Sequence, residues 1–197
     1  MTLVESLIPM AAFAFATSAT PGPVNVISAM SGARFGTFPS LPYVLGATAS
    51  FVVIMLLIGL GFRSFVGLVE TFSRWIALVG AAYLLYLAYK IASDRGDLSF
   101  NGSDGARPGF FTGVLTQAVN PKAWIVSLSA VSLYVGPYED YSLRLLVFAA
   151  IFFAICAVSL AGWVVIGSYL ARFSGNVALF NRIMAVLLVA SVIPMVI

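Results

Sequence analysis

The sequence predicts an all-α integral membrane protein in which six transmembrane helices form two inverted three-helix repeats. Three observations predict it: an apolar composition, six long apolar segments, and one polar stretch that separates these segments into two sets of three. Of the 197 residues, 61% are hydrophobic and 9% are charged, whereas about 25% are charged in a typical soluble domain. Too few polar residues remain to cover a water-soluble surface, so lipid is the expected solvent.

The composition also excludes several kinds of function. The chain contains no histidine and a single cysteine, Cys156, so His-based catalytic triads, His/Cys metal sites and an internal disulfide are not available. Cys156 lies in an apolar segment and is expected to be a small core residue. The net charge of +3 is spread over short loops, which does not indicate nucleic-acid binding. We therefore expect no enzyme activity, no metal, no cofactor and no nucleic-acid partner.

Six segments are apolar and long enough to cross the hydrocarbon core as helices, which takes about 20 residues. Two of them have shorter uninterrupted apolar parts, and each contains an arginine near its start, Arg74 or Arg182, that can reach the interface. No Lys or Arg precedes the first segment, so we interpret it as a retained helix rather than a signal peptide. The six segments are 7–30, 41–62, 72–90, 109–134, 144–168 and 178–197.

The polar stretch 93–108 divides one membrane domain, 1–197, into halves 1–92 and 109–197. The first helix of each half is long and contains proline, and the third helix of each half is short. A unit of three spans enters on one face of the membrane and leaves on the other, so two such units in tandem have opposite orientations. The alternative is that proline occurs in two membrane helices by chance, which is common.

Loop charge predicts the orientation of these spans. The face that carries both termini and the loops 63–74 and 136–144, with Arg144 in the second of them, holds three basic residues, whereas the face that carries 93–108 holds six. Cytoplasmic loops carry an excess of Lys and Arg. We therefore expect the 93–108 loop in the cytoplasm and both termini in the periplasm.

Two helix breaks carry the functional prediction. Pro21, Gly22 and Pro23 interrupt the first segment, and Pro121 interrupts the fourth. Proline removes a backbone hydrogen bond, and in lipid the freed carbonyl groups need another partner or a wet cavity. At 1.5 Å per residue, both breaks lie about 20 Å into their spans. Broken helices that meet at this depth are a common transporter site, because half-helix N-termini bind carboxylates.

Polar side chains next to the breaks are the candidate substrate-binding and hinge residues. Lys122 is the only ionisable residue deep within a predicted span, and such a charge is a functional hypothesis by default. It could bind a substrate carboxylate or change its protonation state; the alternative is that it snorkels or holds carbonyl groups of a neighbouring helix. Asn25 and Asn120 are expected to bond either substrate or freed backbone. The candidate set is Pro21, Gly22, Pro23, Asn25, Gln117, Asn120, Pro121 and Lys122.

Two further patterns concern packing and lining. Gly46 and Ser50 are four residues apart, a spacing that favours close helix packing without any ligand. Thr17, Ser18 and other hydroxyl residues near the breaks could form a polar lining, although each alone more often bonds its own helix backbone.

The chain contains three further motifs, TPGPVN at 20–25, GAAYLLYL at 80–87 and FFTGVLTQAVNPKA at 110–123. Together they resemble motifs of the LysE/RhtB family of amino-acid exporters. Their order and spacing fit the family, and the resemblance covers essentially the whole chain. It implies a secondary transporter of the bacterial inner membrane that exports amino acids or close derivatives, driven by the proton motive force.

One departure from the family's pattern lies in the second helix. Many members have a Gly-Asp or similar polar pair there, but this chain has Ala49-Ser50-Phe51, and no acidic residue lies within any predicted span. A carboxylate proton relay is therefore hard to place, and the substrate or its coupling can differ from other members. The same lack weakens the alternative of a cation exporter on this scaffold, since hard cations prefer carboxylate oxygens.

A non-transporting membrane scaffold subunit is the other alternative, which a dry, packed centre would favour and a polar cavity would oppose. The expected partners are a small zwitterionic substrate and the lipid bilayer. A homo-oligomer stays open on the sequence alone.

Overall fold

The computed structural model describes residues 2–61, 78, 82, 85, 89, 107–174, 182, 183, 186, 189 and 190. These residues form six α-helices and no strand, which confirms the all-α class for the described part of the chain. The predicted spans 72–90 and 178–197 lie almost entirely outside the described residues, as does nearly all of the 93–108 loop.

The first predicted span consists of two helices. α1 (Leu3–Ala19) begins with a capping box, in which Thr2 Oγ1 accepts the Glu5 N–H and the Glu5 carboxylate accepts the Thr2 N–H. α2 (Pro23–Phe35) begins with Pro23. Proline is favoured at the first position of a helix, because the N–H group that it lacks would have no partner within the helix there. The two helices are bent by 62° relative to each other. The predicted break therefore separates two helices rather than kinking one.

The other described helices follow the remaining apolar segments. α3 (Thr37–Leu60) covers the second predicted span, and α7 (Tyr141–Ser174) covers the fifth. The fourth span is divided into α5 (Phe110–Ala118) and α6 (Pro121–Tyr134). By length and composition, α3 and Tyr141–Leu170 of α7 can each cross a membrane, and the bent pair α1 and α2 counts as a third span when taken as one.

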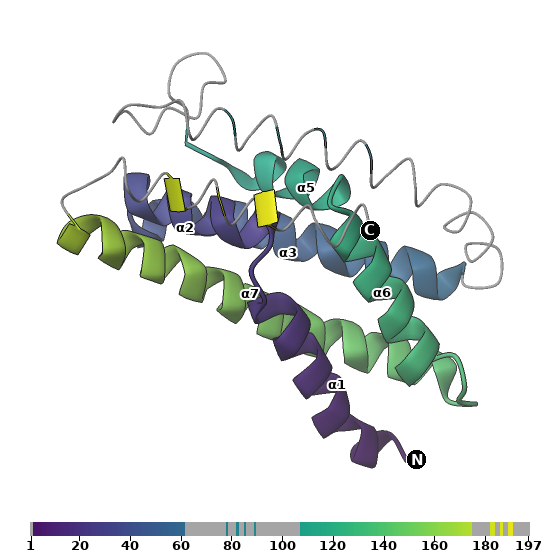
Figure 1. The fold of residues 1–197 in the computed structure, drawn as a ribbon. Coiled ribbons are helices and arrows are strands. Elements are labelled where there is room, and N and C mark those ends of the chain that lie inside the picture. The colour runs from purple at the N-terminus through teal and green to yellow at the C-terminus, as the bar shows by residue number, and fades with distance from the viewer. Residues whose placement is uncertain are drawn as a thin grey trace.

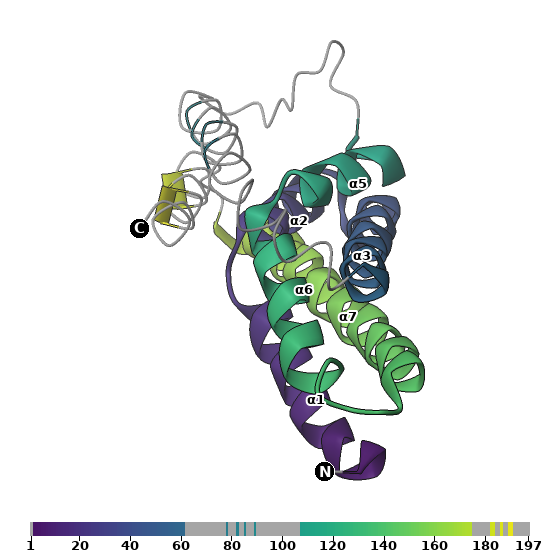
Figure 2. The same cartoon turned by 90° about the vertical axis from the view of Figure 1, so that its right-hand side faces the viewer.

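The helices of the two broken spans run in opposite directions. In Figure 1, α1 and α2 run from the N-terminus at lower right toward the left, whereas α5 and α6 run from the left toward lower right, and Figure 2 shows the same opposition from the side. The long helices α3 and α7 are also antiparallel to each other. α1 and α2 both pack along α7, while α5 and α6 both pack along α3.

Glycine lets two pairs of helices pack backbone to backbone. A Cβ atom on Gly46 of α3 would overlap the carbonyl oxygen of Phe110 in α5. Between α2 and α7 the approach is mutual, since a Cβ on Gly32 or on Gly167 would overlap a carbonyl oxygen of the other helix. Small residues promote such contacts in membranes, where lipid is as apolar as the side chains and hydrophobic burial drives little association. The predicted close packing at Gly46 is confirmed.

Arg144 connects α1, α7 and the loop between α6 and α7. The loop position expected for Arg144 is wrong, because Arg144 lies in the first turn of α7, where its side chain is only 2% exposed. Its Nε donates to Asp140 Oδ1 at 2.5 Å, its Nη1 donates to Ser6 Oγ at 2.7 Å, and its guanidinium carbon lies 3.7 Å from the centroid of the Tyr138 ring. These tertiary partners bury the charge at the end of the molecule where α1 begins.

We predict that Gly46→Ala lowers the free energy of unfolding by about 1–3 kcal/mol, the usual cost of overpacking, because the added methyl group meets a backbone carbonyl that cannot move alone. Gly162→Ala is the matched control, since a Cβ there has open space. Thermal unfolding in detergent can be followed with a thiol-reactive fluorophore, because the single cysteine is buried. Equal melting temperatures for the two variants would contradict the packing described here.

Candidate functional site

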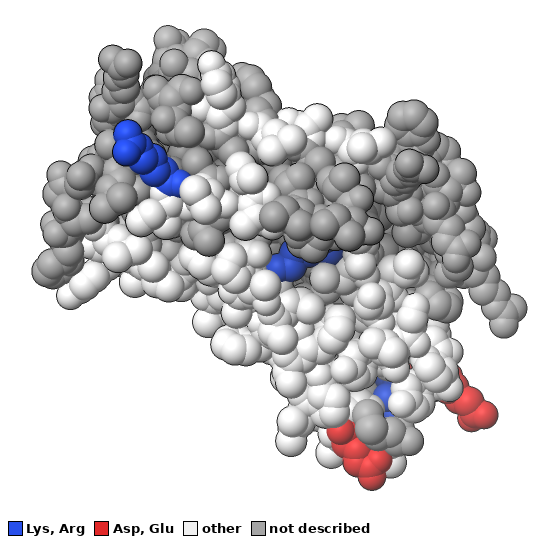
Figure 3. Space-filling view, in the orientation of Figure 1, with Lys and Arg blue, Asp and Glu red and all other residues white. Residues whose placement is uncertain are grey.

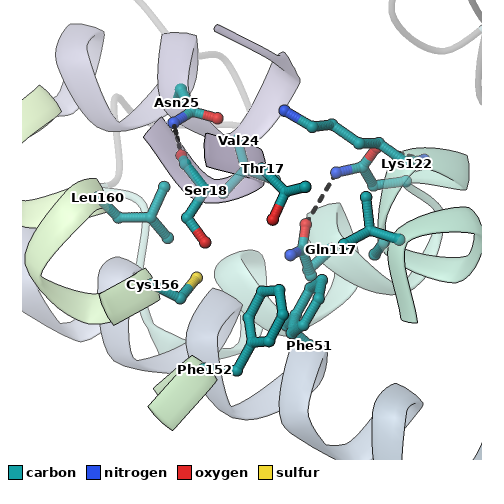
Figure 4. A pocket seen from close by; sticks show the side chains of 13 residues that line it. Thr17, Ser18, Val24, Asn25, Phe51, Gln117, Lys122, Phe152, Cys156 and Leu160 are labelled. Atoms are coloured by element: carbon teal, nitrogen blue, oxygen red, sulfur yellow. Dashed lines mark hydrogen bonds between the residues drawn. The ribbon is translucent and has the colours of Figure 1, made fainter. Parts of the chain in front are cut away.

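A cavity of about 30 Å³ lies between the two helix breaks, and all six described helices contribute to its wall. Figure 4 shows the side chains around it. A cavity of this size has room for about two water molecules. It is lined by Thr17, Ser18, Val24, Asn25, Phe51, Gln117, Asn120, Lys122, Ala123, Val126, Phe152, Cys156 and Leu160.

The last carbonyl groups of α1 are bound by side chains from other helices. Asn25 of α2 donates from Nδ2 to the Ser18 carbonyl oxygen at 2.8 Å, directly across the first break. Trp163 of α7 donates from Nε1 to the next carbonyl oxygen, that of Ala19, at 3.3 Å. The end of a helix leaves such groups without partners inside the helix. Asn25 thus bonds freed backbone, which is one of the two roles expected for it.

Lys122 joins the two breaks. It is the second residue of α6, and its Nζ donates to the carbonyl oxygen of Thr20, 102 positions away in the chain, at 3.0 Å. A Cβ on Gly22 would lie 3.6 Å from this Nζ, so the glycine keeps the space beside the ammonium open. The ammonium therefore lies at the C-terminal end of α1, where the helix dipole is negative. Holding a carbonyl of a neighbouring helix, one of the alternatives for Lys122, is what the structure shows.

The helices that begin at the two breaks differ in their caps. At α6, Asn120 accepts the Lys122 N–H with its Oδ1 at 3.2 Å and donates from Nδ2 to Gln117 Oε1 at 2.9 Å. At α2 the cap residue is Gly22, and no side chain caps the helix. An uncapped helix N-terminus binds carboxylates and phosphates through its N–H groups and its dipole. The first break therefore has the start of a helix and an ammonium group side by side.

The structure brings half of the predicted site residues to the cavity wall. The amide and ammonium side chains line it: Asn25, Gln117, Asn120 and Lys122. The remaining four form the breaks and do not line it: Pro21, Gly22, Pro23 and Pro121. Pro21 is exposed between α1 and α2. Thr17 and Ser18, expected as polar lining, are also on the wall.

Sequence reasoning missed the apolar side of the cavity. The rings of Phe51 and Phe152 stack with their centroids 4.5 Å apart, and Cys156 and Leu160 follow at one and two further turns of α7. The spacing of four places the three α7 residues on one helix face. The sequence does not single out this face, because α7 has apolar residues on all of its faces. Cys156, expected as a core residue, is buried on the cavity wall and accepts a hydrogen bond from Thr48 Oγ1 at 3.8 Å.

Known proteins resemble this chain along most of its length. The model of the LysE type translocator family matches residues 15–196. The cysteine/O-acetylserine efflux protein of Klebsiella pneumoniae is 28% identical over 172 residues, which cover 87% of this chain and 85% of that protein. The protein of the same name from Salmonella typhimurium is 33% identical over 125 residues, 61% of each chain. An uncharacterized membrane protein of Vibrio cholerae is 27% identical over 84% of this chain and 82% of its own length. No solved structure matches.

The family match includes both helix breaks and every residue of the cavity wall described above. It also includes the motifs at 20–25 and 110–123, which form the breaks, and the motif at 80–87, most of which lies outside the described residues. With at least two helices able to cross the bilayer, this is a multi-pass membrane protein. The chain belongs to the LysE type translocator family.

Proposed function

We propose that this protein is a secondary transporter that exports amino acids or close derivatives across the bacterial inner membrane. The observation that carries the proposal is the contact of Lys122 Nζ with the Thr20 carbonyl oxygen, which joins the two helix breaks beside the polar side of the cavity. Breaks of this kind, half way across the bilayer, form the substrate sites of many secondary transporters. The relatives from Klebsiella and Salmonella are named efflux proteins for cysteine and O-acetylserine, and both of these compounds are α-amino acids.

Lys122 and the start of α2 would bind the carboxylate of the substrate. An ammonium and a carboxylate attract each other far more strongly in a site of low dielectric constant than in water. The Oδ1 atom of Asn25 lies 3.5 Å from the position of a Cβ on Gly22, on the same side as the ammonium. The Nδ2 of Asn25 already donates a hydrogen bond to the backbone. Its Oδ1 is therefore the atom that would accept a hydrogen bond from the α-ammonium group of the substrate.

Transport would proceed by alternating access to this cavity. In the present state the cavity has room for about two water molecules, which is less space than any α-amino acid needs. Binding therefore requires the helices around the breaks to move apart. A substrate carboxylate that replaces the Thr20 carbonyl as the partner of Lys122 would release the contact between the two broken spans. The polar lining of the cavity opposes the alternative of a scaffold subunit with a dry, packed centre.

We further propose that 1–197 is one membrane domain of two inverted three-helix halves, with the 93–108 loop in the cytoplasm and both termini in the periplasm. The antiparallel course of the two broken spans, and the packing of each along the long helix of the other half, support the inversion. Figure 3 shows the described acidic side chains together at the end where α1 begins and a basic side chain at the opposite end, with further basic side chains near the middle and beside the acidic ones. Basic residues mark the cytoplasmic side.

Lys122→Met is expected to lower the rate of amino-acid efflux from loaded proteoliposomes by roughly 10- to 100-fold, the equivalent of one hydrogen bond to a charged group. Lys122→Arg keeps the charge and is expected to retain part of the activity. Each variant is measured with and without a pH gradient, because coupling to the proton motive force predicts faster uphill efflux when the gradient is present. The melting temperature shows whether Lys122→Met is folded like the wild type. If it is, and its efflux rate also equals that of the wild type, the site assignment is refuted.

The orientation can be tested with cysteines introduced into a Cys156→Ala background. Thr2→Cys, at the exposed start of α1, is expected to react with a membrane-impermeant maleimide added to cells whose outer membrane has been made permeable. Arg107→Cys, at an exposed position near the end of the 93–108 loop, is expected to react only after the inner membrane is opened. Labelling in the reverse order would show that the termini lie in the cytoplasm.

A further inference from the structure

We infer that the apolar side of the cavity is a side-chain filter, which admits amino acids with short, uncharged side chains and rejects those with basic, acidic or bulky ones. The filter consists of Phe51, Phe152 and Cys156. The inference rests on the proposed function, because it assigns the part of the same cavity that lies away from the carboxylate site. These three residues would determine which amino acids are transported.

The cavity has a polar and an apolar side. In Figure 4, Lys122 and Asn25 lie on one side, Gln117 lies between, and the two phenylalanines and the cysteine lie on the opposite side. An amino acid whose carboxylate is bound at Lys122, and whose side chain follows the cavity, therefore directs that side chain toward Phe152.

The aromatic wall limits how long that side chain can be. Phe152 stacks on Phe51 and also contacts the rings of Phe13 and Phe148, with centroids 6.3 Å and 5.4 Å away. Ring contacts of this kind add to the stability of a densely packed interior. Because Phe152 is held from several sides, it cannot retract to make room without disturbing α1, α3 and α7 together. A bulky substrate side chain therefore meets a rigid wall.

Charge provides the second criterion. Of the described residues that line the cavity, Lys122 alone carries a charge. The side chain of lysine or arginine would find no carboxylate on the apolar side, and that of glutamate would compete with the α-carboxylate for one ammonium group. Burying an unpaired charge is strongly unfavourable. A short hydroxyl, thiol, alkyl or ester side chain has no such penalty, and the hydroxyl groups of Thr17 and Ser18 offer it polar contacts.

The filter is tested by an efflux panel of serine, O-acetylserine, leucine, phenylalanine, lysine and glutamate. Phe152→Ala is expected to raise the ratio of leucine to serine efflux by about tenfold or more, the scale on which apolar pockets distinguish side chains by size. Cys156→Leu, which fills the cavity, is expected to lower the ratio of O-acetylserine to serine efflux. Phe153→Ala is the matched control, because this neighbouring ring is 42% exposed on the outer face of α7; both ratios should stay at the wild-type values.

Alkylation of the single cysteine measures binding without transport. N-ethylmaleimide can modify the purified protein only at Cys156; below the melting temperature it reaches this buried thiol slowly, when the cavity opens, and a substrate in the cavity shields the thiol. We expect saturating serine to slow the alkylation, and lysine and glutamate at the same concentration to have no effect.

The possible failures can be told apart. If serine, lysine and glutamate protect Cys156 equally, or if neither cavity variant changes its efflux ratio, the filter is refuted while an amino-acid site remains. If wild-type protein exports no member of the panel, the proposed function itself is refuted.

Discussion

The carbonyl end of α1 is the constraint on which the rest of the structure depends. The last carbonyl groups of a helix have no partner within it, and in a membrane protein they must be bound by other groups wherever lipid excludes bulk water. Here three successive carbonyls, of residues 18, 19 and 20, accept hydrogen bonds from Asn25, Trp163 and Lys122. These donors belong to α2, α7 and α6, so the requirement to satisfy one helix end positions three other helices. The cavity lies where these helices meet, and its polar side consists partly of the same donors.

The breaks could be predicted from the sequence, but the contacts between them could not. Proline acts on its own chain segment, so Pro23 and Pro121 mark the starts of α2 and α6 without knowledge of the fold. The contact of Lys122 with Thr20 depends on how distant segments pack, and the apolar wall depends on which face of α7 turns inward. Arg144 illustrates the same limit, because a charge at the edge of an apolar segment suggests a loop until its tertiary partners are known.

Aromatic rings and a buried arginine close the described part of the molecule toward the end where α1 begins. The rings of Phe13, Phe148 and Phe152 pack next to the cavity, and the contacts of Arg144 with Ser6 and Asp140 lie beyond them. In the proposed orientation this is the periplasmic end. Export would then require α1, with Phe13 and Ser6, to move away from α7 in each cycle, while the stack of Phe152 on Phe51 stays intact. A buried charge that keeps its hydrogen-bond partners in the closed state favours that state, because opening must supply others.

Lys122 offers a way to link substrate binding to such a movement. A ligand shifts a conformational equilibrium only by the difference between its affinities for the two states. In the state described here the ammonium is bonded to the neutral carbonyl of Thr20, whereas a substrate would offer a carboxylate, whose full negative charge attracts the ammonium more strongly than a carbonyl dipole does. The carboxylate can therefore displace Thr20, but only in a conformation in which the cavity is larger. Lys122 Nζ joins the two broken spans in the state described here. With a substrate carboxylate as its partner, the same atom would favour the state in which the two spans separate.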